Sequence, residues 1–371
     1  MKIGFDAKRA FFNRTGLGNY SRSIIAGLSE HFPLHEYHLY TPKPDRSIPF
    51  HKAGNIFIKG PDRFPFKQLP SYWRTHGIPG QIKRDGIDLF HGLSNEIPFG
   101  IEKTGIPSAV TICDIIFIHH PHLYPFIDRQ VYTMKLANAV RNASRIITIS
   151  KQTKEDIIKH CKIAEDKIRV VYLGCDALFW NPVGESKKTE IISKYNIPDE
   201  FILNVGTIER RKNILSVVKA MRQRKITIPL IIIGRATPYC DEIKDYIEEN
   251  QMKNIFILNN VPLEDLPAFY QKAKLFVYPS IFEGFGIPIL EALVSKTPVL
   301  TTCGGCFEEA GGPTSMYIDP ENVDDIGEKL KSLLDDNALC EKMRKNGLAY
   351  AERFKICNIA AATMKVYEEM V

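Results

Sequence analysis

One short stretch, residues 282–292, constrains this chain more than any other. It reads Phe-Glu-Gly-Phe-Gly-Ile-Pro-Ile-Leu-Glu-Ala. The apolar run at 275–278 before it predicts a short buried strand, and Pro288 suits the first turn of a helix. Strand, glycine-rich turn and helix in this order are typical of a parallel α/β sheet with a ligand at the turn.

The turn itself is suited to an anion. Gly284 and Gly286 let the backbone bend tightly and let a ligand approach it. We expect the N–H groups of Phe285, Gly286 and Ile287 to lie at the helix N-terminus, where a negative charge is favoured. The turn therefore predicts a phosphate-binding site.

Two carboxylates, Glu283 and Glu291, stand on either side of this turn. We expect Glu283 in the loop and Glu291 in the first turn of the helix, so that both face one pocket. Carboxylates suit vicinal hydroxyls and backbone donors suit phosphate, so the combination predicts a sugar nucleotide. The alternative is that the acids only complement the helix dipole.

Length and composition set the class of protein. At 371 residues, 44% hydrophobic and 25% charged, the chain predicts a globular protein of two domains. The net charge of +6 is too mild for a nucleic-acid partner. The start enters a strand directly, without a secretion signal, and no apolar run approaches the roughly 20 residues of a membrane span. We therefore expect a cytoplasmic protein.

The eight cysteines are scattered, which is typical of reduced thiols. Cys303 and Cys306 form the one close pair. A structural metal site needs four ligands, and no second pair supplies the rest. We expect a plain loop pair and no metal.

The first half of the chain predicts a doubly wound fold. A strand at 3–7 leads into a loop at 8–18, and a helix follows. Gly16 and Gly18 would cradle phosphate there. The dinucleotide fingerprint needs a third glycine three residues after Gly18, and the chain has none there, so a hydride-transfer cofactor is disfavoured.

Three polar residues follow the next strands of this half, which we expect at 88–92, 108–113 and 145–149. His91, Asp114 and Ser150 occupy the strand ends, where a parallel sheet binds its ligands. The alternatives are that Ser150 caps a helix and that the other two are hydrogen-bonded in the fold. His119 is expected in a loop unless the ligand crevice reaches it.

Residues 61–79 are rich in proline and aromatic residues and predict a loop. Either the loop packs over a sheet edge, or it forms an acceptor-binding or membrane-facing surface.

The second half repeats the alternation of strands and helices, with strands expected at 201–205, 228–233, 255–258, 275–278, 299–301 and 316–318. The whole chain therefore predicts an α/β protein of two Rossmann-like domains that face each other across a cleft. We place them at residues 1–178 and 179–355. The linker is expected at 180–188, and the last helix, 356–371, is expected to pack back on the first domain.

A basic run, Arg210, Arg211 and Lys212, follows the first strand of the second half. Such runs are often solvated surface. The strand-end position and the glycine turn nearby favour diphosphate binding, with Glu209 neutralising one of the charges.

Taken together, these motifs resemble the retaining glycosyltransferases of family 4, which have the GT-B fold and include many bacterial mannosyltransferases. The most specific piece is Glu283-Gly-Phe-Gly-Ile-Pro-Ile-Leu-Glu291, similar to the E-x7-E element of that family. Supporting pieces are residues 206–213, residues 16–20, Asp114 with His120-Pro121, and Ile149-Ser150.

The resemblance implies a role for each of these residues. Glu283 would hold hydroxyls of the transferred sugar, Glu291 the ribose, and Arg211 with Lys212 the diphosphate. Asp114 would belong to the catalytic set. Further substrate contacts would come from Gly16, Gly18, His91, His119, Ser150, Gly206, Val261 near the base, Phe285, Gly286, Ile287 and Leu290.

The resemblance also implies an activity. A hexose, mannose from GDP-mannose as first choice, would pass to a saccharide or lipid-linked saccharide, without metal or other cofactor, at the inner membrane face. The alternatives are a nucleotide-sugar epimerase on the same fold and a non-catalytic sugar-nucleotide-binding protein. Two departures stand out: Thr207 replaces a common arginine, and Cys113 precedes Asp114 where relatives have histidine, a role open to His119 or His91.

Overall fold

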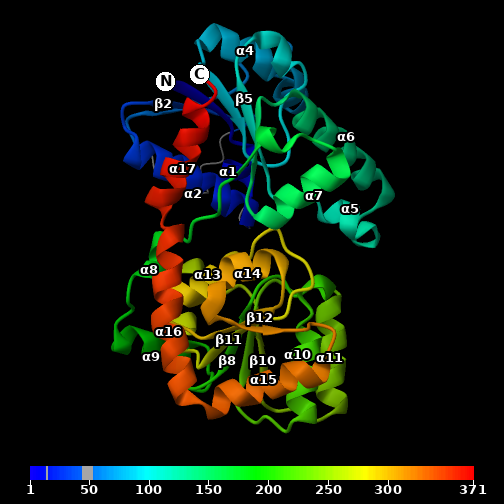
Figure 1. Cartoon of the computed structure of the whole chain (residues 1–371), viewed down its shortest axis with the longest axis vertical. Helices are drawn as coiled ribbons and strands as arrows, with labels where there is room; N and C mark the ends of the chain where they lie inside the picture. Colours follow the sequence, from blue (N-terminus) through cyan, green and yellow to red (C-terminus); the bar gives the residue numbers. More distant parts are fainter. Residues whose placement is uncertain (14–15, 44–52) are drawn as a thin grey trace. The chain divides into compact units, whose positions relative to one another are not determined.

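The structure is a computed structural model that describes residues 1–13, 16–43 and 53–371. The chain forms two compact units (Figure 1). The first comprises Met1–Gly174 and Phe354–Val371, and the second comprises Cys175–Arg353. The division falls after Gly174, whereas the sequence analysis placed it after residue 178. Residues 180–188, expected as the linker, lie inside the second unit and include the start of a helix.

The first unit is built on a parallel sheet of seven strands within the described ranges, ordered β3-β2-β1-β4-β5-β6-β7. Its strands are β1 (Lys2–Asp6), β2 (Glu36–Tyr40), β3 (Ile56–Lys59), β4 (Leu89–Gly92), β5 (Ser108–Ile112), β6 (Arg145–Thr148) and β7 (Ile168–Val170). Most of these strands are buried almost throughout, as expected when helices cover both faces of a parallel sheet.

The α-helices of the first unit are α1 (Lys8–Phe12), α2 (Gly16–His31), α3 (Pro70–Tyr72), α4 (Ile78–Asp85), α5 (Ile116–His119), α6 (Phe126–Asn142), α7 (Lys151–Cys161) and α17 (Ile356–Glu368). Short 3-10 turns lie at Ile101–Thr104, Pro121–Leu123, Glu165–Lys167 and Glu352–Phe354, and a π-helical turn at Trp73–Gly77. No described helix, in either unit, is long and apolar enough to cross a membrane.

Neighbouring residues of one strand serve two different cores, because side chains alternate across a sheet. Leu89 packs in a core with α1, α2 and α17, whereas Phe90 packs in a core with α4 and α6. The sheet thus contributes one face to each of the two hydrophobic cores.

Two predicted loops of this unit are helical. Residues 8–18 contain α1 and the start of α2. The proline-rich segment contains α3, the π-helical turn and α4, with prolines in the first turns of α3 and α4, where the missing N–H costs nothing. Trp73 is fully buried, while Phe64 and Tyr72 are exposed, so the segment both packs and presents surface.

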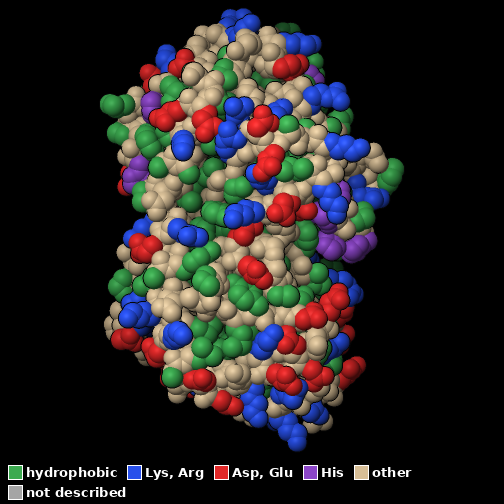
Figure 2. Space-filling view, viewed as in Figure 1, with side chains coloured by type: hydrophobic (Ala, Val, Ile, Leu, Met, Phe, Trp, Pro, Cys, Tyr) green, Lys and Arg blue, Asp and Glu red, His purple; other side chains and the backbone are tan. Residues whose placement is uncertain are grey.

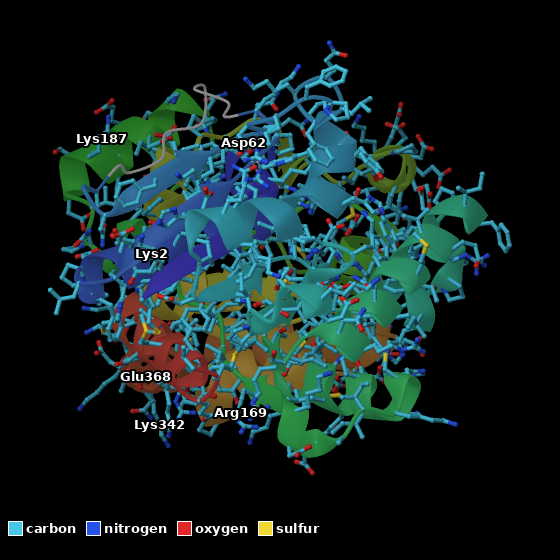
Figure 3. All side chains as sticks on the ribbon, turned by 90° about the horizontal axis from the view of Figure 1, so that it is seen from above. Lys2, Asp62, Arg169, Lys187, Lys342 and Glu368 are labelled. Carbon is cyan, nitrogen blue, oxygen red and sulfur yellow. The ribbon has the colours of Figure 1, made fainter. Side chains whose placement is uncertain are left out.

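The last helix, α17, packs along α2 of the first unit. A Cβ on Gly27 would lie 2.6 Å from Ile356 Cγ1, so the glycine is what allows the two helices to approach so closely. Beyond the helix, Glu369 accepts a hydrogen bond of 2.9 Å from Arg169 Nε. Figure 3 labels Arg169 and Glu368 on this part of the unit.

The second unit has a parallel sheet of six strands by the same description, ordered β10-β9-β8-β11-β12-β13. They are β8 (Ile202–Val205), β9 (Leu230–Ile233), β10 (Ile255–Leu258), β11 (Leu275–Tyr278), β12 (Val299–Thr302) and β13 (Met316–Ile318). Four of them, β8, β9, β11 and β12, are buried at every residue, which explains why they are mainly apolar in the sequence.

The α-helices of this unit are α8 (Ala177–Trp180), α9 (Glu185–Lys194), α10 (Ile214–Gln223), α11 (Tyr239–Glu249), α12 (Leu266–Lys272), α13 (Ile287–Val294), α14 (Gly305–Gly311), α15 (Val323–Asp335) and α16 (Asn337–Ala351). Short 3-10 turns lie at Arg210–Lys212, Leu263–Asp265 and Gly312–Thr314.

Candidate active site

The carboxylate of Glu283 is the centre of an ion cluster in the second unit. Its Oε1 lies 2.5 Å from Lys212 Nζ and 2.7 Å from Arg211 Nη1. The same oxygen accepts hydrogen bonds from Ser280 Oγ at 2.6 Å and Tyr278 Oη at 3.0 Å. The structure thus brings together Glu283, Arg211 and Lys212, three residues that the sequence analysis had grouped.

Two adjacent strand ends hold this cluster. Arg211 and Lys212 lie in the 3-10 turn after β8, whereas Ser280 and Glu283 follow β11. Because β8 and β11 are neighbours in the sheet, their carboxyl ends lie side by side. The loops are also joined directly, since Ile281 N donates to Arg211 O at 2.9 Å.

Burial and charge act against each other in this cluster. Burial disfavours the ionised form of Glu283, but Lys212 and Arg211 outweigh it and lower its pKa to about 2. Burial lowers the pKa of Lys212, an effect that Glu283 opposes. Arg211 also contacts Glu209 Oε1 at 2.7 Å. The site therefore contains two cations, Arg211 and Lys212, paired with two carboxylates, Glu209 and Glu283, beside a glycine turn.

Glycines occupy the turns where a side chain would not fit. Gly286, with φ of 117°, precedes α13, and its backbone is in the region that favours glycine. A Cβ on Gly234 would lie 1.8 Å from the carbonyl oxygen of Gly206, so the turns after β8 and β9 touch backbone to backbone. A Cβ on Gly206, whose φ is 151°, would come within 3.8 Å of Lys212 Cε.

Glu291 lies in a different environment from Glu283. Because α13 begins at Ile287, Glu291 falls in its second turn, and the prediction of a first-turn position is wrong. Its Oε2 accepts a hydrogen bond of 2.8 Å from the buried Tyr270 hydroxyl. Burial raises the pKa of Glu291 to about 7, and Asp176 adds to this. The two glutamates thus have separate partners and opposite pKa shifts.

The other predicted donor-binding residues differ in access. Phe285 and Leu290 are buried side chains, so they can offer a ligand only backbone groups. Ile287 and Val261 are half-buried, Val261 in the segment after β10. Cys303 and Cys306 are both free thiols. Cys303 is exposed after β12, whereas Cys306 is buried in α14, so the two do not form the expected loop pair.

His91 in the first unit is a core residue. It is fully buried, and its ring nitrogens lie 2.6 Å from Tyr367 Oη and 2.8 Å from Thr111 Oγ1. Burial lowers its pKa to about 3. Tyr20 Oη lies 2.9 Å from the same Thr111 oxygen, which extends the chain of contacts to α2. A direct substrate contact by His91 is therefore contradicted by its burial.

Asp114 and Ser150 cap helices. The Oδ1 of Asp114 accepts a hydrogen bond of 3.1 Å from Ile116 N at the start of α5, and Asp114 stays half-buried. Ser150 is fully buried and caps α7 by accepting from Thr153 N at 3.0 Å. Capping, the alternative stated for Ser150, is what the structure shows, and Asp114 retains access to a ligand.

Gly16 and Gly18 both belong to the first turn of α2. Gly16 is exposed with open space around its Cα. A Cβ on Gly18 would lie 1.7 Å from the carbonyl oxygen of Asn13. Gly18 is therefore required by the close approach of Asn13, whatever else binds there.

His119 closes α5 and is half-buried. Its Nε2 lies 3.0 Å from Asp156 Oδ1 on α7, and its ring stands edge-on to that of His160, with centroids 4.9 Å apart. The structure thus places His119 in a cluster with Asp156 and His160, two residues that the sequence analysis did not select.

A buried ion network in the first unit was also missed. Arg74 contacts Asp6 Oδ2 at 2.6 Å and also binds Glu96, which lies 2.7 Å from Lys135 Nζ. Arg74 and Asp6 are only 6% and 4% exposed. Asp6 ends β1, so the rule that selected the other strand-end residues would have found it.

Comparison with known structures defines the class of protein. The chain aligns over its full length with sucrose-phosphate synthase from Thermosynechococcus elongatus, with a TM-score of 0.78, 19% identity and 98% of that chain covered. It aligns over 98% of its length with WaaG, a glycosyltransferase involved in lipopolysaccharide biosynthesis, with a TM-score of 0.71, 17% identity and 99% of that chain covered. Two parallel α/β units of this kind form the GT-B fold, as predicted.

Sequence comparison identifies the family. Residues 14–177 match the model described as Glycosyltransferase Family 4, and residues 187–349 match Glycosyl transferases group 1. O-antigen chain mannosyltransferase B from Escherichia coli is 30% identical over 99% of this chain and 100% of its own length. O-antigen chain mannosyltransferase RfbU from Salmonella typhimurium is 30% identical over 58% of this chain and 57% of its own. The chain belongs to glycosyltransferase family 4 and is mannosyltransferase-like.

Proposed function

We propose that this glycosyltransferase is a retaining, metal-independent hexosyltransferase that moves mannose from GDP-mannose to a hydroxyl group. The acceptor is a saccharide or lipid-linked saccharide in the synthesis of a surface polysaccharide or glycolipid. The cluster of Glu283, Arg211 and Lys212 is the observation that carries the proposal. Similarity to two O-antigen mannosyltransferases supports the choice of sugar and pathway.

The second unit binds the donor in this proposal. Arg211 and Lys212 share their charge between Glu283 and the incoming diphosphate, and the N-terminus of α13 adds backbone donors. Glu283 then holds hydroxyls of the sugar, and Glu291 holds those of the ribose. The low pKa of Glu283 keeps it an anion, and therefore a hydrogen-bond acceptor, at neutral pH.

The transfer breaks the bond between the anomeric carbon and the diphosphate oxygen. An acceptor oxygen forms the new bond on the face that the diphosphate leaves, so the configuration is retained. The proton of the acceptor hydroxyl passes to the departing phosphate, and no protein base is needed. The main task of Arg211 and Lys212 is to stabilise the charge that develops on the leaving group.

Two side-chain cations at the site support independence from metal, because they supply positive charge where Mg²⁺ would otherwise act. We expect the rate of enzyme treated with EDTA to be unchanged by added Mg²⁺ or Mn²⁺. A rate that rises several-fold with either ion would contradict this part of the proposal.

A donor screen tests the proposed substrate. Thermal unfolding and hydrolysis are measured across GDP-, UDP- and dTDP-linked sugars, and GDP-mannose is expected to give the largest stabilisation and the fastest release of nucleoside diphosphate. If a different sugar nucleotide gave the largest stabilisation and the fastest release, its base and sugar would replace guanine and mannose in the proposal. A sugar nucleotide converted to its epimer without an acceptor would favour the epimerase, and binding without turnover the non-catalytic alternative.

The retaining outcome needs a separate measurement. Once an acceptor is found, the anomeric configuration of the new linkage is read by NMR at early times. An α-linked product from the α-linked donor is expected. An inverted product would exclude attack from the side of the leaving group.

We also propose that the protein works at the inner face of the membrane through exposed apolar residues of the first unit. Leu123 lies just before α6, and the others are in the first half of the helix: Phe126, Ile127, Val131, Tyr132 and Met134. Such a concentration of exposed apolar side chains favours a contact with lipid or with the apolar part of a lipid-linked acceptor. The net charge of +6 favours an anionic surface.

Sedimentation with vesicles tests the membrane contact. The protein is expected to bind vesicles rich in anionic lipid, and Phe126→Ser with Ile127→Ser is expected to abolish most of that binding. Leu34→Ser is the control, because Leu34 is an even more exposed apolar side chain, at 94%, but lies before β2 and away from α6 in the sequence. Equal loss in both variants would contradict the assignment to α6.

A further inference from the structure

Three metal-ligating side chains of the first unit meet outside the predicted donor site. The ligand atoms of His119, Asp156 and His160 all lie within 4.8 Å of one another. Figure 2 shows histidine side chains gathered on the part of the surface where Figure 1 draws α5. The cluster is partly sheltered, since His119 and Asp156 are half-buried and His160 is exposed.

The cluster stands on two anchored helices. Asp156 and His160 are one helical turn apart on α7, so they share a face. Ile157, between them, is fully buried and fixes that helix in the core. His119 closes α5, which is held by the buried Ile116 and Phe117. Two rigid elements therefore present the three ligands toward one point.

The present contacts are close to those around a bound ion. His119 Nε2 lies 3.0 Å from Asp156 Oδ1, and the rings of His119 and His160 are 4.9 Å apart. Ligands that each bind zinc at about 2.0–2.2 Å in a tetrahedral arrangement stand roughly 3.3–3.5 Å from one another. The ligand atoms of the three residues lie within 4.8 Å of one another, so a bound ion would draw the most distant pair closer together.

The type of ligand selects the type of ion. Two imidazoles and one carboxylate favour zinc or a neighbouring transition metal, whereas Mg²⁺ and Ca²⁺ prefer oxygen ligands alone. Three protein ligands leave a fourth position for water, or for a fourth side chain.

We propose that His119, Asp156 and His160 bind a zinc-class divalent ion that joins the end of α5 to α7. Asp114, two residues before the start of α5, accepts a hydrogen bond from Ile116 N, the first residue of that helix. The ion would therefore fix the short segment on which Asp114 is carried. It takes no part in the transfer step, and the inference stands independently of the donor proposed above.

Zinc binding to the whole protein tests this inference. Protein stripped with EDTA and dialysed is titrated with Zn²⁺ against a fluorescent chelator, and bound metal is counted by elemental analysis. We expect one tightly held ion per chain and a higher melting temperature for the first unit. His119→Ala, Asp156→Ala and His160→Ala are each expected to weaken binding by at least roughly tenfold, since even outer partners of metal ligands act on that scale.

Two controls separate this site from others. His31→Ala removes an exposed histidine at the end of α2 and is expected to leave binding unchanged. Eight free cysteines could also hold zinc, so Co²⁺ is used as a spectroscopic probe. Visible bands without a thiolate charge-transfer band support the inference. A thiolate band, equal loss in His31→Ala, or zinc binding that survives in the His119, Asp156 and His160 variants would overturn it.

Discussion

Both units carry polar residues just after parallel strands, but they use them differently. In the second unit, residues after β8 and β11 form an ion cluster around Glu283 beside a glycine turn. In the first unit, His91 and Ser150 are fully buried and bonded to the surrounding fold. We therefore expect a strand-end position to indicate a ligand-binding residue only where charged side chains and a glycine turn occur with it.

This difference can be tested by substitutions that should act on stability in one unit and on turnover in the other. The largest effect is expected at Arg74. Arg74→Ala leaves Asp6 and Glu96 without their main cation in a buried site. Breaking a buried ion pair by removing one partner costs about 3–5 kcal/mol.

Urea unfolding of the first unit checks this value, with Arg84→Ala as the control. Arg84 pairs with Asp62 at the surface, where such a pair contributes about 0–1 kcal/mol. Similar losses of unfolding free energy in the two variants would show that the buried Arg74 network stabilises this unit no more than a surface ion pair does.

The next effect is expected at Lys212. Lys212→Ala removes one of the two cations that neutralise the diphosphate and should lower kcat about 10²–10³-fold, with the fold retained. Steady-state rates with the donor found in the screen measure it, and Lys219→Ala, on the exposed side of α10, is the control. Near-normal turnover of Lys212→Ala would refute the site.

A substitution of His91 is expected to change stability and not turnover, the reverse of Lys212→Ala. His91→Ala should lower stability by about 1–3 kcal/mol, because it removes the His91 contact of the buried Tyr367 hydroxyl and leaves Thr111 Oγ1 with only its contact to Tyr20. Tyr367→Phe should be milder, and the double variant should lose less than the sum of the two. We expect kcat/KM for the acceptor to be unchanged in the folded variants. A large fall would make His91 a substrate contact after all.

The smallest effect is expected at Glu291 and depends on pH. The folded protein holds a proton on Glu291 up to about pH 7, whereas the unfolded chain loses it near 4.5. Stability from this group is therefore complete below about pH 4.5 and is lost as pH rises through 7. Glu291→Gln should remove that loss; the two pKa values bound the gain in stability at pH 8 at about 3 kcal/mol, and we expect less than this bound.

Thermal unfolding at pH 5 and pH 8 measures this gain, which should appear only at the higher pH. Donor binding is expected to weaken in the same variant if Glu291 holds the ribose. The Glu283 carboxylate, whose pKa is lowered, should show the reverse dependence, with stability lost as pH falls from about 4.5 toward 2. If the difference in stability between Glu291→Gln and the parent protein were the same at pH 5 and pH 8, the raised pKa of Glu291 would be contradicted.

Much of the fold could be predicted because its signals are local. The inner strand β9 of the second unit is buried on both faces, so its sequence, Leu230–Ile233, is apolar throughout. The basic run and the two glutamates could be grouped because each follows a strand directly. The rule of strand ends then brought Arg211, Lys212 and Glu283 together without knowledge of the contacts.

What sequence could not supply depends on distant partners. His91 and Tyr367 are 276 residues apart, so nothing near His91 indicates that it is buried. The helices around Trp73 were missed because prolines within the segment indicated breaks, although proline is well tolerated in a first turn. His119 was treated as a loop residue because its partners Asp156 and His160 belong to another helix.

Because the first unit is completed by the last helix of the chain, α17, its folding depends on the end of protein synthesis. The ribosome makes the entire second unit before the helix that supplies Tyr367 to His91. At about 5–20 residues per second, the nascent first unit waits on the order of tens of seconds with the face of α2 around Gly27 uncovered. During that interval it is a natural client for chaperones, whereas the second unit, encoded without interruption, can fold as it emerges.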